Sequence, residues 1–305
     1  MNATRRALIL ALVPFALGLA IGLLLRVTSD RLPIIRLRAD LGTWLALLGG
    51  LLSLLALTGV VVWAIAGRRL DRALTEARQA QAEAHRRFLR QLDHELKNPL
   101  TAIRIGLANL AGTPRGEARD RTLAGVEGQV GRLSKLATDL RKLADLETQP
   151  LERAAVNLSE LLSEVVTLAK QRPEGKEREV ILALPQAPWP LPQVSGDRDL
   201  LFLAVYNLLD NALKFTHPDD TIEVRAIEDG RVVTVEIADT GPGIPADELS
   251  HVFEELYRGQ GARGTEGSGL GLALVRAIVE RHNGTVTARS REGEGTVFIL
   301  HLPLG

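Results

Sequence analysis

The chain opens with two long apolar segments separated by a short polar one. Ala7–Leu25 has 19 residues without a charged side chain. As a helix it would be about 28 Å long, close to the thickness of a bilayer core. The second segment, Leu41–Gly67, carries Trp44 and Trp63 near its two ends, where tryptophan favours the membrane interfaces. The pattern predicts a membrane anchor over residues 1–67, with two transmembrane helices at 7–25 and 41–67 joined by a short outer loop.

A cleaved secretory signal peptide is the alternative for the first segment, because Arg5 and Arg6 precede it. However, the apolar stretch is longer than the core of a usual signal peptide, and it runs directly into Arg26 without a small-residue cleavage site. A retained transmembrane helix is therefore the preferred interpretation.

Beyond the second apolar segment, the pattern changes to that of amphipathic helices. Residues 68–111 are rich in Ala, Arg, Glu and Leu and lack glycine before Gly106, which predicts one long helix continuing from the membrane. After the turn AGTPRGEARD, a second helix is predicted by apolar residues spaced three and four apart: Leu123, Val126, Val130, Leu133, Ala137, Leu140 and Ala144. Such a hairpin, over residues 68–148, cannot cover its own apolar face. We therefore expect a homodimer in which two hairpins form a four-helix bundle.

Residues 153–305 combine helical and strand-like patterns. Asn157, followed three positions later by Glu160, is typical of a helix N-terminus. Farther on, TIEVRAIE and RVVTVEIAD alternate between apolar and polar residues on either side of Asp229 and Gly230, which favours a β-hairpin. This part of the chain is therefore expected to form a separate α/β domain.

Composition narrows the classes of function. The 305 residues include 37 basic and 37 acidic side chains. This balance is not that of a uniformly basic nucleic-acid-binding protein, so no nucleic-acid partner is expected. The chain has no cysteine, which excludes disulfides, thiolate metal sites and cysteine nucleophiles.

One histidine stands in a chemically suggestive position. On the predicted helix, His94 lies about 200° from the stripe formed by Leu92 and Leu96, so it faces water. Glu95 follows it directly. A neutral imidazole whose second nitrogen is held by a carboxylate is a competent nucleophile near neutral pH. Taken by itself, a solvated surface histidine is the simpler interpretation.

The segment around this histidine, HELKNPLT, resembles the H-box of sensor histidine kinases of two-component systems. The resemblance implies that His94 accepts the γ-phosphoryl group of ATP and that Glu95 acts as a general base. It further implies that Asn98 positions water for dephosphorylation of a response regulator. A chain of this family must also contain an ATP site.

Four later segments resemble the boxes of the GHKL ATPase superfamily. NLLDNALKFT is similar to the N-box, DTGPGIP and GSGLGLAL to the two glycine boxes, and VFEELYRG to the F-box, with Leu256 where phenylalanine is more usual. The resemblance implies an α/β sandwich of the GHKL (Bergerat) type that binds ATP and Mg²⁺. The residues implied in binding are Asn207, Asn211, Lys214, Asp239, Gly241, Gly243, Phe253, Tyr257, Gly267, Gly269 and Gly271.

Individual contacts follow from the same resemblance. Asn211 is expected to bind the metal, Lys214 a phosphate group, and Asp239 the amino group of adenine. On a helix, Asn207 and Asn211 lie four residues apart and share a face, so both amides can point toward one metal ion or its waters. The glycines of GSGLGLAL open an apolar helix, whose backbone N–H groups and dipole favour an anion.

Together these features predict a homodimeric, multi-pass sensor histidine kinase in the cytoplasmic membrane, with its kinase domains in the cytoplasm. It would pass the phosphoryl group from His94 to an aspartate of a response-regulator receiver domain and would also act as a phosphatase. A pseudokinase that only binds nucleotide and an ATPase that drives assembly are the alternatives. The intact His94, Glu95 and Asn211 disfavour the pseudokinase, and the H-box disfavours the ATPase.

The stimulus is not apparent from the sequence. Residues 26–40, between the two predicted spans, form too short a segment to enclose a ligand pocket of several hundred cubic ångströms. Sensing is therefore expected within the membrane lipid or through a partner membrane protein.

Overall fold

The computed structural model describes residues 35–112, 116–185, 190–262, 265 and 267–304, together with the isolated positions 16, 20, 21, 23, 24 and 27. The chain divides into two compact units, residues 1–86 and 87–305. The predicted first transmembrane segment, 7–25, lies almost wholly outside the described residues. It therefore stays a prediction.

Helix α2 (Ile35–Gly112) is 78 residues long and contains the second apolar segment. Among the described residues, one helix, over Leu47–Leu110, is long and apolar enough to cross a membrane. Many large apolar side chains along the first half of α2, including Trp44 and Trp63, are exposed. Exposure of so many apolar groups is unfavourable in water but not in lipid. The continuous helix predicted from the second apolar segment through residue 111 is confirmed.

Helix α3 (Glu117–Thr148) pairs with the end of α2 to form the predicted hairpin. Arg119 Nη1 donates to the carbonyl of Leu110 at 2.9 Å and so joins the two helices across the turn. A Cβ on Gly106 of α2 would lie 2.5 Å from Cγ2 of Val126 on α3, so the helices approach too closely for a side chain at that position. The predicted antiparallel hairpin is present.

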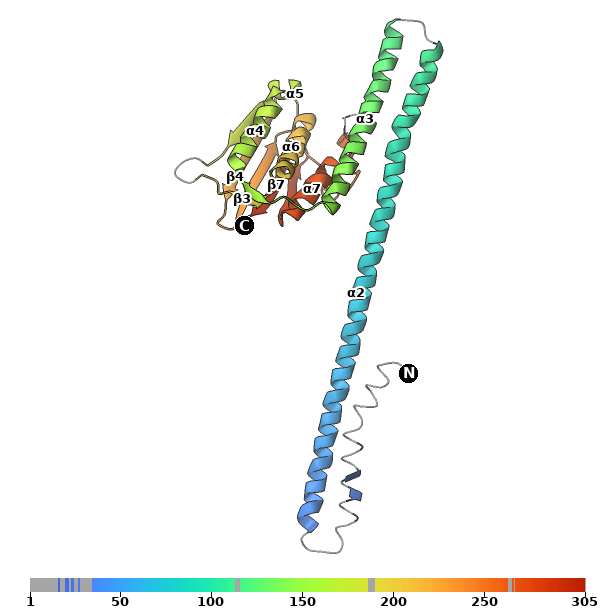
Figure 1. Cartoon of the computed structure of the whole chain (residues 1–305), viewed down its shortest axis with the longest axis vertical. Helices are drawn as coiled ribbons and strands as arrows, with labels where there is room; N and C mark the ends of the chain where they lie inside the picture. Colours follow the sequence, from blue (N-terminus) through green and yellow to red (C-terminus); the bar gives the residue numbers. More distant parts are fainter. Residues whose placement is uncertain are drawn as a thin grey trace. The chain divides into compact units, whose positions relative to one another are not determined.

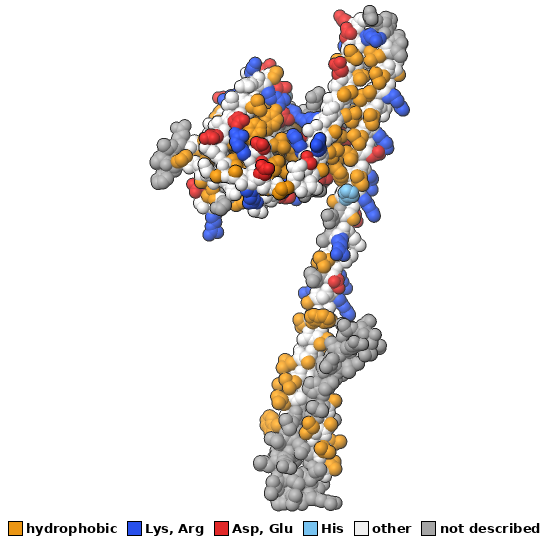
Figure 2. Space-filling view, viewed as in Figure 1, with side chains coloured by type: hydrophobic (Ala, Val, Ile, Leu, Met, Phe, Trp, Pro, Cys, Tyr) orange, Lys and Arg blue, Asp and Glu red, His pale blue; other side chains and the backbone are white. Residues whose placement is uncertain are grey.

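Much of the hairpin's apolar surface remains uncovered in the single chain. Figure 2 shows hydrophobic side chains gathered along both of its helices. Among the described side chains of residues 68–148, seven large apolar ones are at least 46% exposed: Leu74, Leu89, Leu100, Ile105, Leu107, Leu123 and Val130. A face of this kind normally contacts another surface.

The α/β domain contains a five-stranded sheet of order β2-β4-β5-β7-β6 and a two-stranded antiparallel sheet of β1 and β3. In the larger sheet β2 and β4 are parallel, and the other neighbouring pairs are antiparallel. The strands are β1 (Ala154–Val156), β2 (Glu179–Ala183), β3 (Val194–Gly196), β4 (Thr221–Glu228), β5 (Val232–Asp239), β6 (Thr285–Arg291) and β7 (Gly295–Pro303). The helices are α4 (Leu158–Gln171), α5 (Pro173–Lys176), α6 (Arg198–Phe215), the short η2 (Gln260–Ala262) and α7 (Gly271–Arg281).

One face of the larger sheet is covered by α4, α6 and α7 (Figure 1). Burial alternates along β4 and β5, as their apolar–polar pattern predicts, so Val224 and Val235 are buried while Arg225 and Glu236 form an ion pair on the other face. The predicted hairpin around Asp229 and Gly230 is confirmed by the antiparallel pairing of β4 with β5. The result is a two-layer α/β sandwich.

The first helix of this domain begins as its sequence predicts. Asn157 Oδ1 accepts a hydrogen bond from the N–H of Glu160 at 3.3 Å, and Asn157 Nδ2 donates to Glu160 Oε1 at 2.8 Å. These two bonds fix the N-terminus of α4. The helix then buries Leu161, Leu162 and Val165 completely in the core.

Candidate functional site

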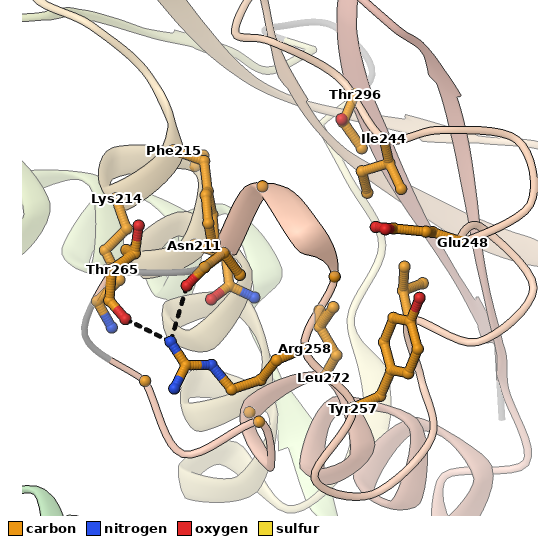
Figure 3. A pocket seen from close by; sticks show the side chains of 18 of the residues that line it. Asn211, Lys214, Phe215, Ile244, Glu248, Tyr257, Arg258, Thr265, Leu272 and Thr296 are labelled. Atoms are coloured by element: carbon orange, nitrogen blue, oxygen red, sulfur yellow. Dashed lines mark hydrogen bonds between the residues drawn. The ribbon is translucent and has the colours of Figure 1, made fainter.

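A pocket of about 570 Å³ opens at the end of the α/β domain where α6, the segment after β5, the segment before α7 and the start of α7 meet (Figure 3). Its volume lies within the usual range for small-molecule sites. Nine of the eleven residues implied in nucleotide binding line it: Asn207, Asn211, Lys214, Asp239, Gly243, Tyr257, Gly267, Gly269 and Gly271. Gly241 and Phe253 do not.

Three of these residues lie on one side of α6. Asn207, Asn211 and Lys214 are spaced by four and three residues and therefore share a helix face. Asn207 Nδ2 donates to the carbonyl of Leu203 at 2.9 Å, and its Oδ1 lies against Gly271, where a Cβ would be 3.4 Å away. The expected shared face is present, and one of its amides is already held in place by the helix backbone.

A charged cluster surrounds Asp210 on the same helix. Lys214 pairs with Oδ2 of Asp210 and Arg172 with Oδ1. Burial raises the pKa of Asp210, but its hydrogen bonds and ion pairs with Lys214 and Arg172 outweigh this effect, and the pKa lies below its ordinary value. Asp210 is therefore a carboxylate that holds Lys214 at the edge of the pocket.

Asp239 ends β5 and turns into the pocket wall. Its Oδ1 accepts a hydrogen bond from the N–H of Gly241 at 3.0 Å, and burial raises the pKa of the carboxyl group. The backbone of Thr296 also hydrogen-bonds to this carboxyl group. Since the two oxygens of a carboxylate offer about four acceptor positions, capacity remains for a donor on a ligand. This arrangement suits recognition of an amino group.

Of the two glycines after Asp239, Gly243 lines the pocket and Gly241 does not. Gly243 has φ +70°, and a Cβ there would lie 2.1 Å from the carbonyl oxygen of Arg291. Only glycine fits this close approach between two chain segments. Gly241 serves the turn that hydrogen-bonds to Asp239 and does not line the pocket.

The segment resembling the F-box divides between the pocket and the core. Tyr257 lines the pocket, whereas Phe253 packs edge-on against Phe298, with ring centroids 6.1 Å apart. Arg258 Nη2 donates to the carbonyls of Ala262 and Thr265 at 2.8 and 2.7 Å (Figure 3). These bonds hold the segment that follows against the pocket.

The second glycine segment leads into α7. Gly269 has φ +72°, and a Cβ there would lie 2.9 Å from the backbone of Leu256. Gly271 is the first residue of α7, so the free N–H groups of that helix begin at the pocket wall. Helix N-termini of this kind favour anions such as phosphate.

The three residues of the H-box lie elsewhere. His94 and Asn98 are exposed on α2, Glu95 is half-buried, and none of them lines the pocket. The structure therefore gathers most of the expected nucleotide-binding residues but does not bring His94 into their pocket.

Several pocket residues were missed by the sequence analysis. Ile244, Glu248, Arg258, Leu272, Thr296 and Phe298 line the pocket and are labelled in part in Figure 3. Ile244, Arg258 and Leu272 lie within the three segments DTGPGIP, VFEELYRG and GSGLGLAL, so the motifs alone could have indicated them. Thr296 and Phe298 lie on β7, where nothing local distinguishes a pocket residue from any other strand residue. Lys135 and Asp139 of α3 also line the pocket.

The residues present fit a magnesium nucleotide. No group of three or more His, Asp or Glu side chains suited to a metal occurs in the described part of the chain. Mg²⁺ bound to a nucleotide needs few protein ligands, because phosphates and waters supply most of its coordination. Such a ligand requires amides near the metal, a cation near the phosphates, an acceptor for the nucleobase and a helix N-terminus. The pocket offers Asn207 and Asn211 of α6, Lys214, Asp239 and the start of α7.

Comparison with protein families assigns both regions. A family model described as the His Kinase A (phospho-acceptor) domain matches residues 84–149. A second, described as the histidine kinase-, DNA gyrase B- and HSP90-like ATPase, matches residues 196–305. The two matches cover the hairpin and most of the α/β domain.

Individual proteins resemble the chain over the same regions. It is 38% identical over 244 residues to the probable sensor histidine kinase TcrY of Mycobacterium tuberculosis, covering 78% of this chain and 50% of that protein. It is 35% identical over 243 residues to the signal transduction histidine-protein kinase/phosphatase MprB of Mycobacterium sp. (strain KMS), covering 76% and 45%. The chain thus spans about half the length of these relatives.

A solved structure supports the same assignment. Full-length ShkA in complex with AMPPNP is 30% identical to this chain and superimposes with a TM-score of 0.51, covering 70% of this chain and 44% of that one. That similarity extends across more of the chain than the α/β domain alone.

Proposed function

Since this chain belongs to the sensor histidine kinases of two-component systems, we propose that it transfers the γ-phosphoryl group of ATP to His94 and then to an aspartate of a response regulator. The observation that carries the proposal is the presence in one chain of an exposed His94, followed by Glu95 in a phosphoacceptor domain, and a pocket that gathers nine of the expected nucleotide-binding residues.

The transfer step uses the two ring nitrogens of His94 differently. One nitrogen attacks the γ-phosphorus, a nitrogen–phosphorus bond forms, and the bond to the β–γ bridging oxygen breaks, so that ADP leaves. The other nitrogen loses its proton to Glu95, which acts as the general base. His94 is exposed and lies outside the pocket, so transfer requires the nucleotide and the histidine to approach each other.

In the pocket, each group would act on a different part of the nucleotide. Asp239 accepts a hydrogen bond from the adenine amino group, Lys214 binds a phosphate, and the N-terminus of α7 faces the phosphate chain. Asn211, assisted by Asn207, would hold Mg²⁺, which supplies charge neutralisation to the phosphates when bound. Tyr257 closes the side of the pocket opposite these amides, and Gly241 and Phe253 act through the turn and the packing beneath it.

The hairpin would supply the dimer and the regulator-binding surface. Its uncovered apolar side chains fit a homodimer in which two hairpins form a four-helix bundle. Asn98 is exposed one turn from His94, where its amide can orient water for dephosphorylation of a bound regulator. The similarity to MprB, a histidine-protein kinase/phosphatase, supports this second activity.

We place the protein in the cytoplasmic membrane as a multi-pass chain, with spans at 7–25 and 41–67. We place the phosphotransfer domain at 68–148 and the catalytic domain at 153–305. ATP is cytoplasmic, so the kinase domains and both termini lie inside. Sensing would use the surrounding lipid or a partner membrane protein, since residues 26–40 are too few for a ligand pocket.

The proposal is tested by labelling the full chain in detergent micelles with γ-³²P-ATP. Wild type should acquire acid-labile, alkali-stable label, and His94→Gln should acquire none while its affinity for ATP stays unchanged, because His94 lies outside the pocket. His85→Gln is a matched control, since His85 is also exposed on α2.

The two alternatives give different outcomes. Free phosphate without labelled protein would identify an ATPase, and nucleotide binding without either product would identify a pseudokinase. Label that persists in His94→Gln would contradict the assignment of the phosphoacceptor.

A further inference from the structure

The nucleotide pocket is not built from the α/β domain alone. Lys135 and Asp139, both on α3 of the phosphoacceptor hairpin, form part of its wall. They are four residues apart and therefore lie on the same side of the helix. Neither residue belongs to a segment that resembles a nucleotide-binding box.

A buried hydrogen bond holds this side of α3 in place. Ser268 Oγ donates to Asp139 Oδ2 at 2.6 Å, and both side chains are less than 9% exposed. Ser268 lies between Gly267 and Gly269, in the segment that leads into α7. The contact thus joins α3 directly to the segment expected to face the phosphates.

Apolar packing reinforces the contact. Leu136, the residue after Lys135, is 3% exposed and packs with Leu256 and Leu270 of the α/β domain. Leu256 has φ +61°, a strained backbone conformation for leucine, and is nevertheless 4% exposed. Leu256, which stands where phenylalanine is more usual, is therefore well packed, and its contact with Leu136 holds α3 beside the pocket.

The far end of α3 is attached as well. Arg281, the last residue of α7, donates to the carbonyls of Leu146 and Gln149, the latter at 2.7 Å. With contacts at Asp139, Leu136 and Leu146, the C-terminal half of α3 is held against the domain over three turns.

In this position, Lys135 joins two other cations around Asp210. Its Nζ lies 3.9 Å from Asp210 Oδ2, the same oxygen that pairs with Lys214, while Arg172 occupies Oδ1. Three cations thus face Asp210, and one of them, Arg172, also pairs with Glu174, with Nε 3.6 Å from Oε2. The two lysines at the pocket, Lys135 and Lys214, therefore share one oxygen of Asp210, and Asp139 is the other acid that acts on Lys135.

The pKa of Lys135 reflects these surroundings. Partial burial, followed by the proximity of Lys214, lowers its pKa below the ordinary value, even though Asp210 and Asp139 act in the opposite direction. A lysine in this state gains from a further anion nearby. The side chain is still 48% exposed, so it is free to turn from Asp210 toward a ligand.

From this juxtaposition we propose that Lys135 is a phosphate-binding residue supplied by the phosphoacceptor hairpin, so that bound ATP connects the two domains. A polyphosphate would draw Lys135 and Lys214 away from their shared oxygen on Asp210 and be bound by both ammonium groups. The inference rests on the proposed nucleotide site but not on phosphoryl transfer to His94.

The test measures nucleotide affinity rather than labelling. In the full chain carrying His94→Gln, which excludes transfer, a fluorescent ATP analogue is displaced by MgATP and by adenosine. Lys135→Gln should lower the affinity for MgATP about tenfold, the loss expected for one charge-assisted hydrogen bond. It should leave the affinity for adenosine unchanged. Lys135→Arg should restore most of the affinity for MgATP.

Lys142→Gln is the matched control, since Lys142 lies two turns farther along α3, is also partly exposed and does not line the pocket. It should bind both ligands as the parent does. The proposal is overturned if Lys135→Gln binds MgATP normally, or if it loses MgATP and adenosine equally, which would mean that Lys135 only maintains the pocket's shape. Either result leaves the labelling test of His94 unaffected.

Discussion

The phosphoacceptor hairpin and the α/β domain differ in how far they bury their apolar side chains. In the α/β domain, Leu161, Leu208 and Ile237 are essentially unexposed. On the hairpin, Leu100 and Leu107 remain 54% and 55% exposed. One region therefore completes its own core within the chain, whereas the other presents a surface whose burial depends on a partner. The same division separates their chemistry, because the domain encloses a pocket and the hairpin displays an exposed histidine.

The largest expected effect is on the pocket of the α/β domain, through a substitution of Asp239. Asp239→Asn keeps a carbonyl oxygen for the N–H of Gly241 but replaces the second acceptor with a donor. We expect ATP affinity to fall about a hundredfold and the preference for ATP over GTP to disappear, because an acceptor for the adenine amino group is lost. Competition between the two nucleotides for a fluorescent analogue measures this directly.

Asp219→Asn is the control for that substitution, since Asp219 is an exposed acid that does not line the pocket. It should leave both affinities unchanged. An undiminished preference for ATP in Asp239→Asn would mean that another group recognises the base.

A second pair of substitutions compares burial in the two regions. Leu208→Ala removes a completely buried side chain from α6 and should destabilise the α/β domain by about 3 kcal/mol. Leu107→Ala, the same change on the exposed face of the hairpin, should alter the stability of that domain by less than about 0.5 kcal/mol. Hydrogen exchange of the amides in β5 reports the opening free energy in each variant. Equal effects would show that the hairpin and the domain unfold together.

The smallest expected effect concerns a histidine inside the domain. His282 is 3% exposed; its Nε2 accepts from the N–H of Asp197 at 2.9 Å, and its Nδ1 donates to the carbonyl of Ile278 at 2.7 Å. These two roles require the neutral ring, and burial lowers the pKa of His282. The unfolded chain therefore takes up the proton first as the pH falls.

The contribution of the neutral His282 ring to the stability of the folded chain is complete above the pKa of histidine in the unfolded chain, about 6.5. It is lost progressively as the pH falls below that value. We expect the melting temperature of the full chain to fall between pH 7.5 and pH 5.5, and His282→Gln to reduce that slope. His217→Gln changes a histidine whose side chain is 79% exposed and should leave the slope unchanged. A wild-type slope in His282→Gln would assign the acid sensitivity to other groups.

Much of this architecture was predictable because it depends on local patterns. The capping pair Asn157 and Glu160, the hairpin at Asp229 and the shared face of Asn207 and Asn211 each follow from residues a few positions apart. The same holds for the exposure of His94, which depends only on its angle from Leu92 and Leu96. In these cases helix and strand periodicity are sufficient.

The pocket wall was predictable only in part. Motif comparison located Asp239 and Tyr257 in the pocket wall. Phe253, named by the same comparison, does not line the pocket but packs against Phe298, which does. Gly241 is likewise beside the pocket rather than in it. A motif identifies a segment, but the direction of each side chain depends on what the rest of the domain packs against it.

By itself, then, the sequence determined the long helix, the hairpin and the strand pattern, because each depends on short-range periodicity. It also determined the order of the regions and the segments that carry the chemistry, because these depend on residue identity. Only the tertiary structure decided that Lys135 and Asp139 join the nucleotide pocket, that Lys214 shares Asp210 with Arg172, and that Gly243 is required by the carbonyl of Arg291. These contacts join residues that are distant in the chain. Their free energies come from packing, burial and charge in three dimensions, which no local pattern of residues records.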